Sequence, residues 1–199
     1  MKKTLVRFAM FAGLLVLLGA CSVKLPPIDV AGWFGGGDTL SGEMTDGIWS
    51  ATSPEAVSSA DIPAFSRGGI RLSSISLGDG TVAPAGVALV APQQAGEPAE
   101  LLLSVYLSTT SMASATDGDL LVTVSVDLES AGDGSYTLVA GSVEYVSAID
   151  DSVLTEALSA VNFFAGVVCE LVDSSGTRVA GDWTFSIDSV TAEAALSLF

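Results

Sequence analysis

Residues 120–128 carry the strongest structural signal in this chain. Leu120, Val122, Val124, Val126 and Leu128 share one parity, and Leu121, Thr123, Ser125 and Asp127 share the other. Side chains alternate with a period of two along a strand, so the pattern predicts a β-strand with one buried and one solvent-facing side. The turn sequence Asp133-Gly134 follows, and residues 135–147 offer a return strand. The segment therefore predicts an antiparallel hairpin.

Several other segments are also typical of strands, being rich in Val, Ile, Leu, Thr and Ser. They are residues 69–77, 86–91, 100–109, 166–172 and 182–190, and the sequence 173–176 between the last two predicts a turn. One stretch has helical spacing instead, from the predicted cap Asp150 through residues 151–164. A second short helix is predicted to begin at Ser53-Pro54. Strands dominate, so we expect an all-β, mainly antiparallel fold: a β-sandwich or small barrel with one amphipathic helix near 151–164.

The N-terminus has the organisation of a targeting segment. Lys2, Lys3 and Arg7 precede the apolar run 8–18, and Gly19-Ala20 provides a small-residue cleavage zone directly before Cys21. The apolar run is shorter than the roughly 20 residues that a membrane-spanning helix needs. The predicted organisation is a signal peptide at 1–20, a tether at 21–39, containing Pro26-Pro27 and a glycine run, and a single β-rich domain at 40–199.

The sequence Leu-Gly-Ala-Cys at 18–21 resembles the lipobox of bacterial lipoproteins. That resemblance implies acylation of Cys21 and a membrane partner bound through N-terminal lipid. Ser22 rather than aspartate follows the cysteine, which implies the outer membrane in a diderm cell; in a monoderm cell the protein would lie on the outer face of the cytoplasmic membrane. A plain secretory signal is the alternative. Trp33 and Phe34 lie inside the predicted tether and could touch the membrane interface or pack on the domain.

The composition excludes several classes of function. After residue 20 the chain keeps four basic residues against 23 acidic ones, a formal charge of −19, which opposes nucleic-acid binding. There is no histidine, and Lys24 is the one lysine after residue 20. Catalytic triads, histidine-bound zinc and Schiff-base chemistry are therefore disfavoured. With Cys21 acylated, Cys169 would have no disulfide partner, and its valine-rich surroundings predict a buried thiol.

Carboxylates supply the weak site candidates. Asp117 and Asp119 could ligate calcium, although Asp-Gly sequences are also ordinary turn sequences. Two acidic pairs, Glu97 with Glu100 and Asp150 with Asp151, could serve a hydrolase or simply lie at solvated element ends. No cofactor is implied. Phe199 resembles the terminal aromatic of outer-membrane barrels, but the alternate positions before it do not fit.

Three functions remain open at this stage. The first is a non-catalytic cell-envelope lipoprotein whose β-domain binds a protein, a glycan or another envelope component. The second is a carrier that holds a small apolar ligand inside a β-sandwich or barrel. The third is a carboxylate-dependent hydrolase. A packed interior would favour the first, an apolar internal cavity the second, and two facing acids in a cleft the third.

Overall fold

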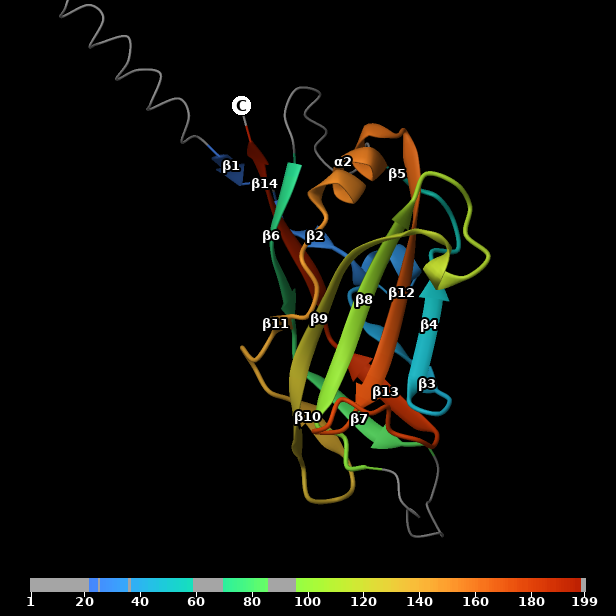
Figure 1. Cartoon of the computed structure of the whole chain (residues 1–199), viewed down its shortest axis with the longest axis vertical. Coiled ribbons are helices and arrows are strands. Elements are labelled where there is room, and N and C mark those ends of the chain that lie inside the picture. Colours follow the sequence, from blue (N-terminus) through green and yellow to red (C-terminus); the bar gives the residue numbers. More distant parts are fainter. Residues whose placement is uncertain (1–21, 25, 36, 59–69, 86–95, 198–199) are drawn as a thin grey trace, which may run out of the picture.

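The computed structural model describes residues 22–24, 26–35, 37–58, 70–85 and 96–197. Over these residues the fold is mainly antiparallel β with one α-helix, which confirms the predicted fold class (Figure 1). The predicted leader 1–20, Cys21, the predicted strand 86–91 and Phe199 lie outside the described residues. No helix of the described residues is both long and apolar enough to span a membrane.

A large sheet of ten strands forms the body of the molecule. Its strands are β3 (Leu40–Met44), β4 (Ile48–Thr52), β5 (Val57–Ser58), β7 (Gly80–Pro84), β8 (Glu100–Ser108), β9 (Asp119–Ser130), β10 (Tyr136–Leu138), β11 (Glu144–Tyr145), β12 (Asn162–Val172) and β13 (Trp183–Ile187). Eight of them run in the order β3-β13-β7-β10-β9-β8-β12-β4, with every pair antiparallel. The two end strands, β3 and β4, are consecutive in the chain and are joined by a short turn. The sheet therefore curls round until its two ends meet.

A two-residue turn and one indole ring nearly close this curled sheet. Asp46 and Gly47 have φ values of 51° and 69°, which is the geometry of the type I′ turn that the Asp-Gly pair favours. Beyond the turn, Trp49 packs directly on Gly42 of β3 and lies edge-on to Phe185, with ring centroids 5.0 Å apart. The indole therefore fills the space where β3 and β4 separate.

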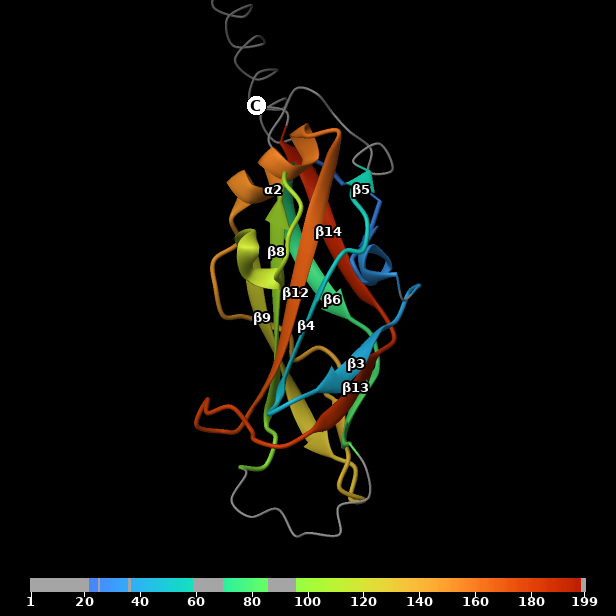
Figure 2. The same ribbon diagram turned by 90° about the vertical axis from the view of Figure 1, so that its right-hand side faces the viewer.

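A smaller sheet of four strands continues from one end of the large one. It contains β1 (Ser22–Lys24), β2 (Ile28–Asp29), β6 (Ile70–Leu77) and β14 (Val190–Ser197), with β14 paired to all three others. β6 runs on into β7, and β13 runs on into β14, so one long ribbon belongs to both sheets. Hydrogen bonds from Gly78 N to Ser189 O and from Asp188 N to Asp79 O, each 2.8 Å, hold the ribbon together where it bends (Figure 2).

The predicted strand at 120–128 is confirmed as part of β9, but its face assignment is wrong at one end. Val105 pairs with Val122 and Tyr106 with Leu120, which leaves Leu121 as the extra residue of a β-bulge. Leu121 is 4% exposed and Leu120 37% exposed. A bulge breaks the period of two. The even-numbered residues from Val122 to Val126 point into the core, but before the bulge Leu121 is buried in place of Leu120.

The predicted helix is shorter than expected. α2 spans Asp151–Ser159, and Ala160 already has extended backbone angles. Val161 is exposed, and Phe163 is fully buried in β12, which pairs with β8 over nine positions. The predicted helix is therefore wrong beyond residue 159: apolar spacing does not by itself separate a helix from a buried strand, and residues 162–164 pair with β5 and β8.

Two more expectations need correction, and a third is confirmed. The predicted return strand 135–147 is split into β10 and β11, which pair with β9 at separate places. No helix begins at Ser53: the chain bends at Pro54 and Glu55 between β4 and β5, and the Ser53 hydroxyl accepts a hydrogen bond from the Ala165 amide, 3.1 Å away. The turn at 173–176 is confirmed, with Gly176 N donating to Asp173 O over 2.9 Å.

Part of the segment expected to be a tether belongs to the fold. The 3₁₀ turn η1 (Ala31–Phe34) follows β2, and Val30 N donates to Val190 O of β14 over 2.8 Å. Ala31 is fully buried. The structured region thus extends N-terminal of the predicted boundary at residue 40, because apolar side chains at 28–34 fill the space beside β14. Trp33 and Phe34 pack on their own core, as one of the two alternatives expected.

Candidate functional site

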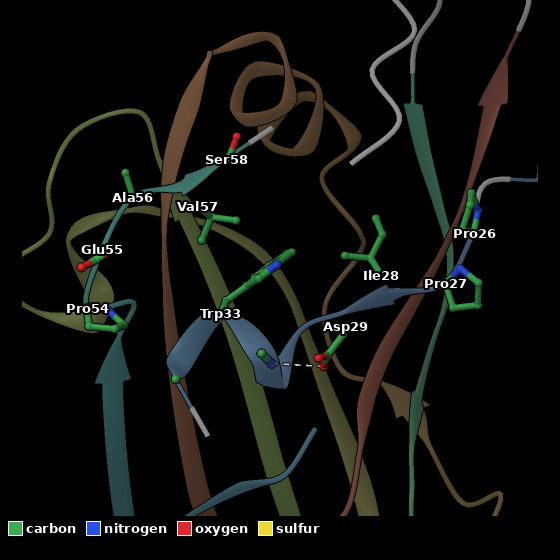
Figure 3. Close-up of a pocket in the computed structure, with 12 residues that line it drawn as sticks. Pro26, Pro27, Ile28, Asp29, Trp33, Pro54, Glu55, Ala56, Val57 and Ser58 are labelled. Carbon is green, nitrogen blue, oxygen red and sulfur yellow. Dashed lines mark hydrogen bonds between the residues drawn. The ribbon is translucent and has the colours of Figure 1, made fainter. Parts of the chain in front are cut away.

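A surface groove lies between the N-terminal segment and the chain that joins β4 to β5 (Figure 3). Its volume is about 610 Å³. The lining residues are Pro26, Pro27, Ile28, Asp29, Gly32, Trp33, Gly35, Pro54, Glu55, Ala56, Val57 and Ser58. Prolines and aliphatic side chains predominate, so the groove presents a mostly apolar floor to solvent.

One wall of the groove is built by β2 and η1. The Trp33 ring meets Phe163 edge-to-face, with centroids 5.4 Å apart and an interplanar angle of 84°. The Asp29 carboxylate accepts a hydrogen bond from the Gly32 amide over 3.1 Å, which fixes the tight turn into η1. A Cβ at Gly32 would fall on that carboxylate and would have to displace it, so glycine allows the Asp29 side chain to keep this hydrogen bond. The position of the Trp33 side chain is therefore fixed by its contact with Phe163 and by the hydrogen-bonded turn that precedes it.

The opposite wall follows β4 and is fixed to β12. Ser53 N donates to Ala165 O over 2.8 Å, and the Ser53 hydroxyl receives the Ala165 amide in return. After this anchor Pro54 restricts its own backbone and removes one amide donor. Val57 and Ser58 then pair with Phe163 and Asn162. Phe163 thus contacts both walls, as the pairing partner of Val57 and the ring partner of Trp33.

The charged residues that line the groove are both acidic. Asp29 and Glu55 are its two charged lining residues, and both are exposed. Figure 3 shows them on opposite sides of Trp33, with Asp29 turned toward the backbone of η1. Their separation leaves an apolar strip between two carboxylates. This surface suits an apolar group that carries a positive charge at its edge.

Of the two predicted calcium candidates, Asp117 has backbone hydrogen-bond partners. Asp117 ends η3 (Ala115–Asp117), and its carboxylate accepts hydrogen bonds from the amides of Ala113 and Ser114, at 2.9 and 2.8 Å. Asp119 begins β9. Among the described residues, no three His, Cys, Asp or Glu side chains gather in an arrangement that could hold a metal ion.

The two carboxylate pairs also lie at element ends. Glu97 precedes β8, and Glu100 is its first residue. Asp150 caps α2, and hydrogen bonds from Ser152 hold the pKa of its carboxyl below the ordinary value of 3.8. The neighbouring Asp151 accepts the Leu72 amide of β6 over 3.1 Å. Each of these helix-end carboxylates therefore has a hydrogen-bonding role in the fold.

The interior of the large sheet is filled with side chains. Phe163, Met44, Leu101, Leu103, Leu107, Leu171 and Ile187 are the largest of the side chains with under 2% exposure. Cys169 is fully buried among them, as predicted, and burial raises the pKa of its thiol far above the ordinary value. A thiol in this setting stays protonated and unreactive.

Sequence reasoning found only part of this groove. It singled out Pro26, Pro27 and Trp33 but placed them in a tether, and it placed Pro54 in a helix. The sequence signal for the groove was its two proline-containing segments, at Pro26-Pro27 and at Pro54. Proline favours extended chain over helix interiors, so both segments could have been predicted to be extended. Their meeting at Phe163 depends on β12, whose sequence lies more than 100 residues away.

The comparisons with known proteins name no family for this chain. No family model matches it, and no curated protein matches it. Among solved structures, it is similar to a proposed glycoside hydrolase from Bacteroides thetaiotaomicron, with 15% identity and a TM-score of 0.25. That similarity covers 58% of this chain and 37% of the other. The TM-score is too low to support a conclusion about fold or activity.

Proposed function

We propose that this protein is a non-catalytic, lipid-anchored protein of the cell envelope that binds a segment of a partner protein in the groove between Trp33 and Pro54. The observation that carries the proposal is the groove itself: an apolar surface strip flanked by Asp29 and Glu55. The partner segment would be extended, apolar and positively charged at one or both ends.

The sequence supports the anchor and the lack of catalysis. The lipobox-like residues 18–21 provide the acylation site at Cys21. The absence of histidine and the single lysine after residue 20 leave few residues able to move protons near neutral pH. Asp117, Asp150 and Asp173 accept backbone hydrogen bonds at turns or helix ends, which supports a structural role for them.

The shape and lining of the groove support a protein partner. An extended peptide can lay alternate side chains into a shallow apolar groove while its backbone stays in solvent. Proline walls add apolar area without the entropy cost of ordering flexible side chains. Trp33 is the kind of rigid aromatic anchor on which interface energy concentrates.

The volume of the groove also favours a second candidate function. About 610 Å³ lies within the range of roughly 300–1,000 Å³ that small-molecule sites occupy. A small apolar cation could fill the same space. In this alternative the protein would carry the ligand on its surface and not inside the large sheet.

Site-specific crosslinking in the native envelope tests the proposal. A photoreactive phenylalanine analogue is placed at Ala56, an exposed lining residue, and for comparison at Glu129, which is exposed near the far end of β9. We expect a discrete protein adduct from position 56 that position 129 does not form. Adding Glu55→Lys should reduce that adduct by about fivefold or more, because it reverses one of the two groove charges.

Two outcomes would contradict the proposal. The same adducts from both positions would show that crosslinking does not depend on the groove. A low-mass adduct at position 56 without any protein adduct would support the small-ligand alternative instead.

A further inference from the structure

Two of the three basic residues that the structure describes lie near the predicted anchor. Three basic residues fall within the described ranges: Lys24, Arg71 and Arg178. Lys24 pairs with Ala195 of β14, and Ala195 pairs with Arg71 of β6. The two cations therefore lie in one row across the small sheet, on either side of a single alanine.

Both cations lie on the outer face of this sheet. Directly opposed residues of an antiparallel pair point to the same side, so the Lys24, Ala195 and Arg71 side chains share a face. The opposite face is the dry one, since Leu72 and Ala194 are 7% and 1% exposed. Lys24 has 82% of its side chain exposed, and Arg71 is exposed as well.

Two carboxylates share this face with the basic row, Glu193 and Asp29, because Asp29 pairs with Thr191 of the same β14 face. Glu193 lies 3.6 Å from the Lys24 ammonium, and its side chain is 46% exposed. An exposed pair of this kind is weak and readily screened, so it leaves Lys24 hydrated and able to meet another anion. No carboxylate of the described chain forms an ion pair with Arg71. Asp29 lies opposite Thr191, four positions along β14 from the row, so the end of the face nearest Cys21 keeps a positive balance.

The basic row lies close to Cys21 and therefore close to the membrane surface that the proposed anchor would reach. Cys21 directly precedes β1, so acyl chains at Cys21 would join the molecule at the β1 end of the small sheet (Figure 1). Anionic phospholipid headgroups attract nearby Lys and Arg within about one Debye length. The acidic surface of the rest of the domain would be repelled by the same headgroups.

We propose that the outer face of the small sheet, through Lys24 and Arg71, lies against anionic phospholipid headgroups and orients the domain on its membrane. The inference rests on the acyl anchor of the proposed function. The anchor provides the attachment, and the basic row selects which face meets the surface.

Lys24 itself supplies the measurement. It is the one lysine after residue 20, so the acetylation of its side chain by a membrane-impermeant reagent can be followed by mass spectrometry of a single peptide. The acylated full chain is bound to vesicles of phosphatidylcholine alone or with phosphatidylglycerol. We expect phosphatidylglycerol to slow acetylation by about fivefold, and high salt to restore the rate.

Two charge reversals form a matched comparison. Arg71→Glu and Arg178→Glu change the net charge equally, but Arg178 lies in the bridge to Val172, away from the small sheet. Arg71→Glu should abolish the protection of Lys24, whereas Arg178→Glu should leave it unchanged.

Vesicle flotation separates this inference from the anchor. Protein that floats with both vesicle types, yet shows equal Lys24 acetylation on each, would overturn the proposed orientation and leave the anchor intact. Protein that fails to float would overturn the anchor and this proposal with it. Equal loss of protection in both variants would show that net charge, and not this face, is responsible.

Discussion

At the scale of single residues, the contact between Gly42 and Trp49 fills the gap between the two end strands of the large sheet. A Cβ at residue 42 would lie 2.7 Å from the Cδ1 and Cε2 atoms of the indole. The indole cannot retreat freely, because its other side meets Phe185. Glycine is therefore needed at position 42 for steric reasons, although the backbone there has no left-handed conformation.

Gly42→Ala should destabilise the protein by about 1–3 kcal/mol, the usual cost of overpacking a core contact. The measurement is the free energy of unfolding in urea. The same substitution in a Trp49→Ala background should cost much less, since the clash is gone. An equal cost in both backgrounds would contradict the proposed contact.

At the scale of elements, the bulge in β9 exchanges the roles of two neighbouring leucines. Leu121 turns into the core, and Leu120 turns outward. Leu121→Asp should therefore cost about 3 kcal/mol or more, because it buries an unpaired carboxylate. Leu120→Asp should cost less than about 1 kcal/mol. Urea unfolding of the two variants checks this order, and the reverse order would restore the unbroken alternation of the sequence.

Three Asp-x-Ser sequences form the same local turn. In each, the aspartate carboxylate accepts hydrogen bonds from the amide and the hydroxyl of the serine two residues on. The aspartates are Asp133, Asp150 and Asp173, and these bonds lower the pKa of all three carboxyls. A lowered pKa means that the bonds stabilise the charged form, so they favour folding above the ordinary pKa and weaken as the pH falls below it.

The cap of α2 gives a test of this pH dependence. Asp150→Ala should lower the urea midpoint at pH 7, because it removes the acceptor for Ser152 N and Val153 N. Asp150→Asn should retain most of the midpoint, since Asn also caps helices. The advantage of Asp150 over Asn should shrink between pH 7 and pH 3. An advantage that grows toward pH 3 would contradict the assigned pKa direction.

At the scale of the whole molecule, attachment and folding are expected to be independent. The described core lies C-terminal to Cys21, and its buried residues run from Ile28 to Ala194. We expect the Cys21→Ala chain, secreted behind a conventional cleavable leader, to leave the membrane fraction with an unchanged melting temperature. The native leader with Cys21 is the control. A variant that stays with the membrane after cleavage would count against the acyl anchor.

The sequence by itself determined the elements whose signal is local. The alternation at 120–128, the cap at Asp150 and the turn at 173–176 were readable, because each depends on residues within a few positions of one another. The all-β class followed from the same local patterns. The poverty of catalytic residue types was likewise a property of composition alone.

Only the tertiary structure decided the rest, because pairing partners lie far apart in the chain. Leu121 is buried because β8 imposes a bulge, and residues 162–164 form a strand because β8 and β5 pair with them. Residues 28–34 join the core because β14 offers them hydrogen bonds and apolar surface. The groove forms because Trp33 and Val57 both contact Phe163, which lies far from each of them in the chain. No local sequence pattern could predict that these three residues meet.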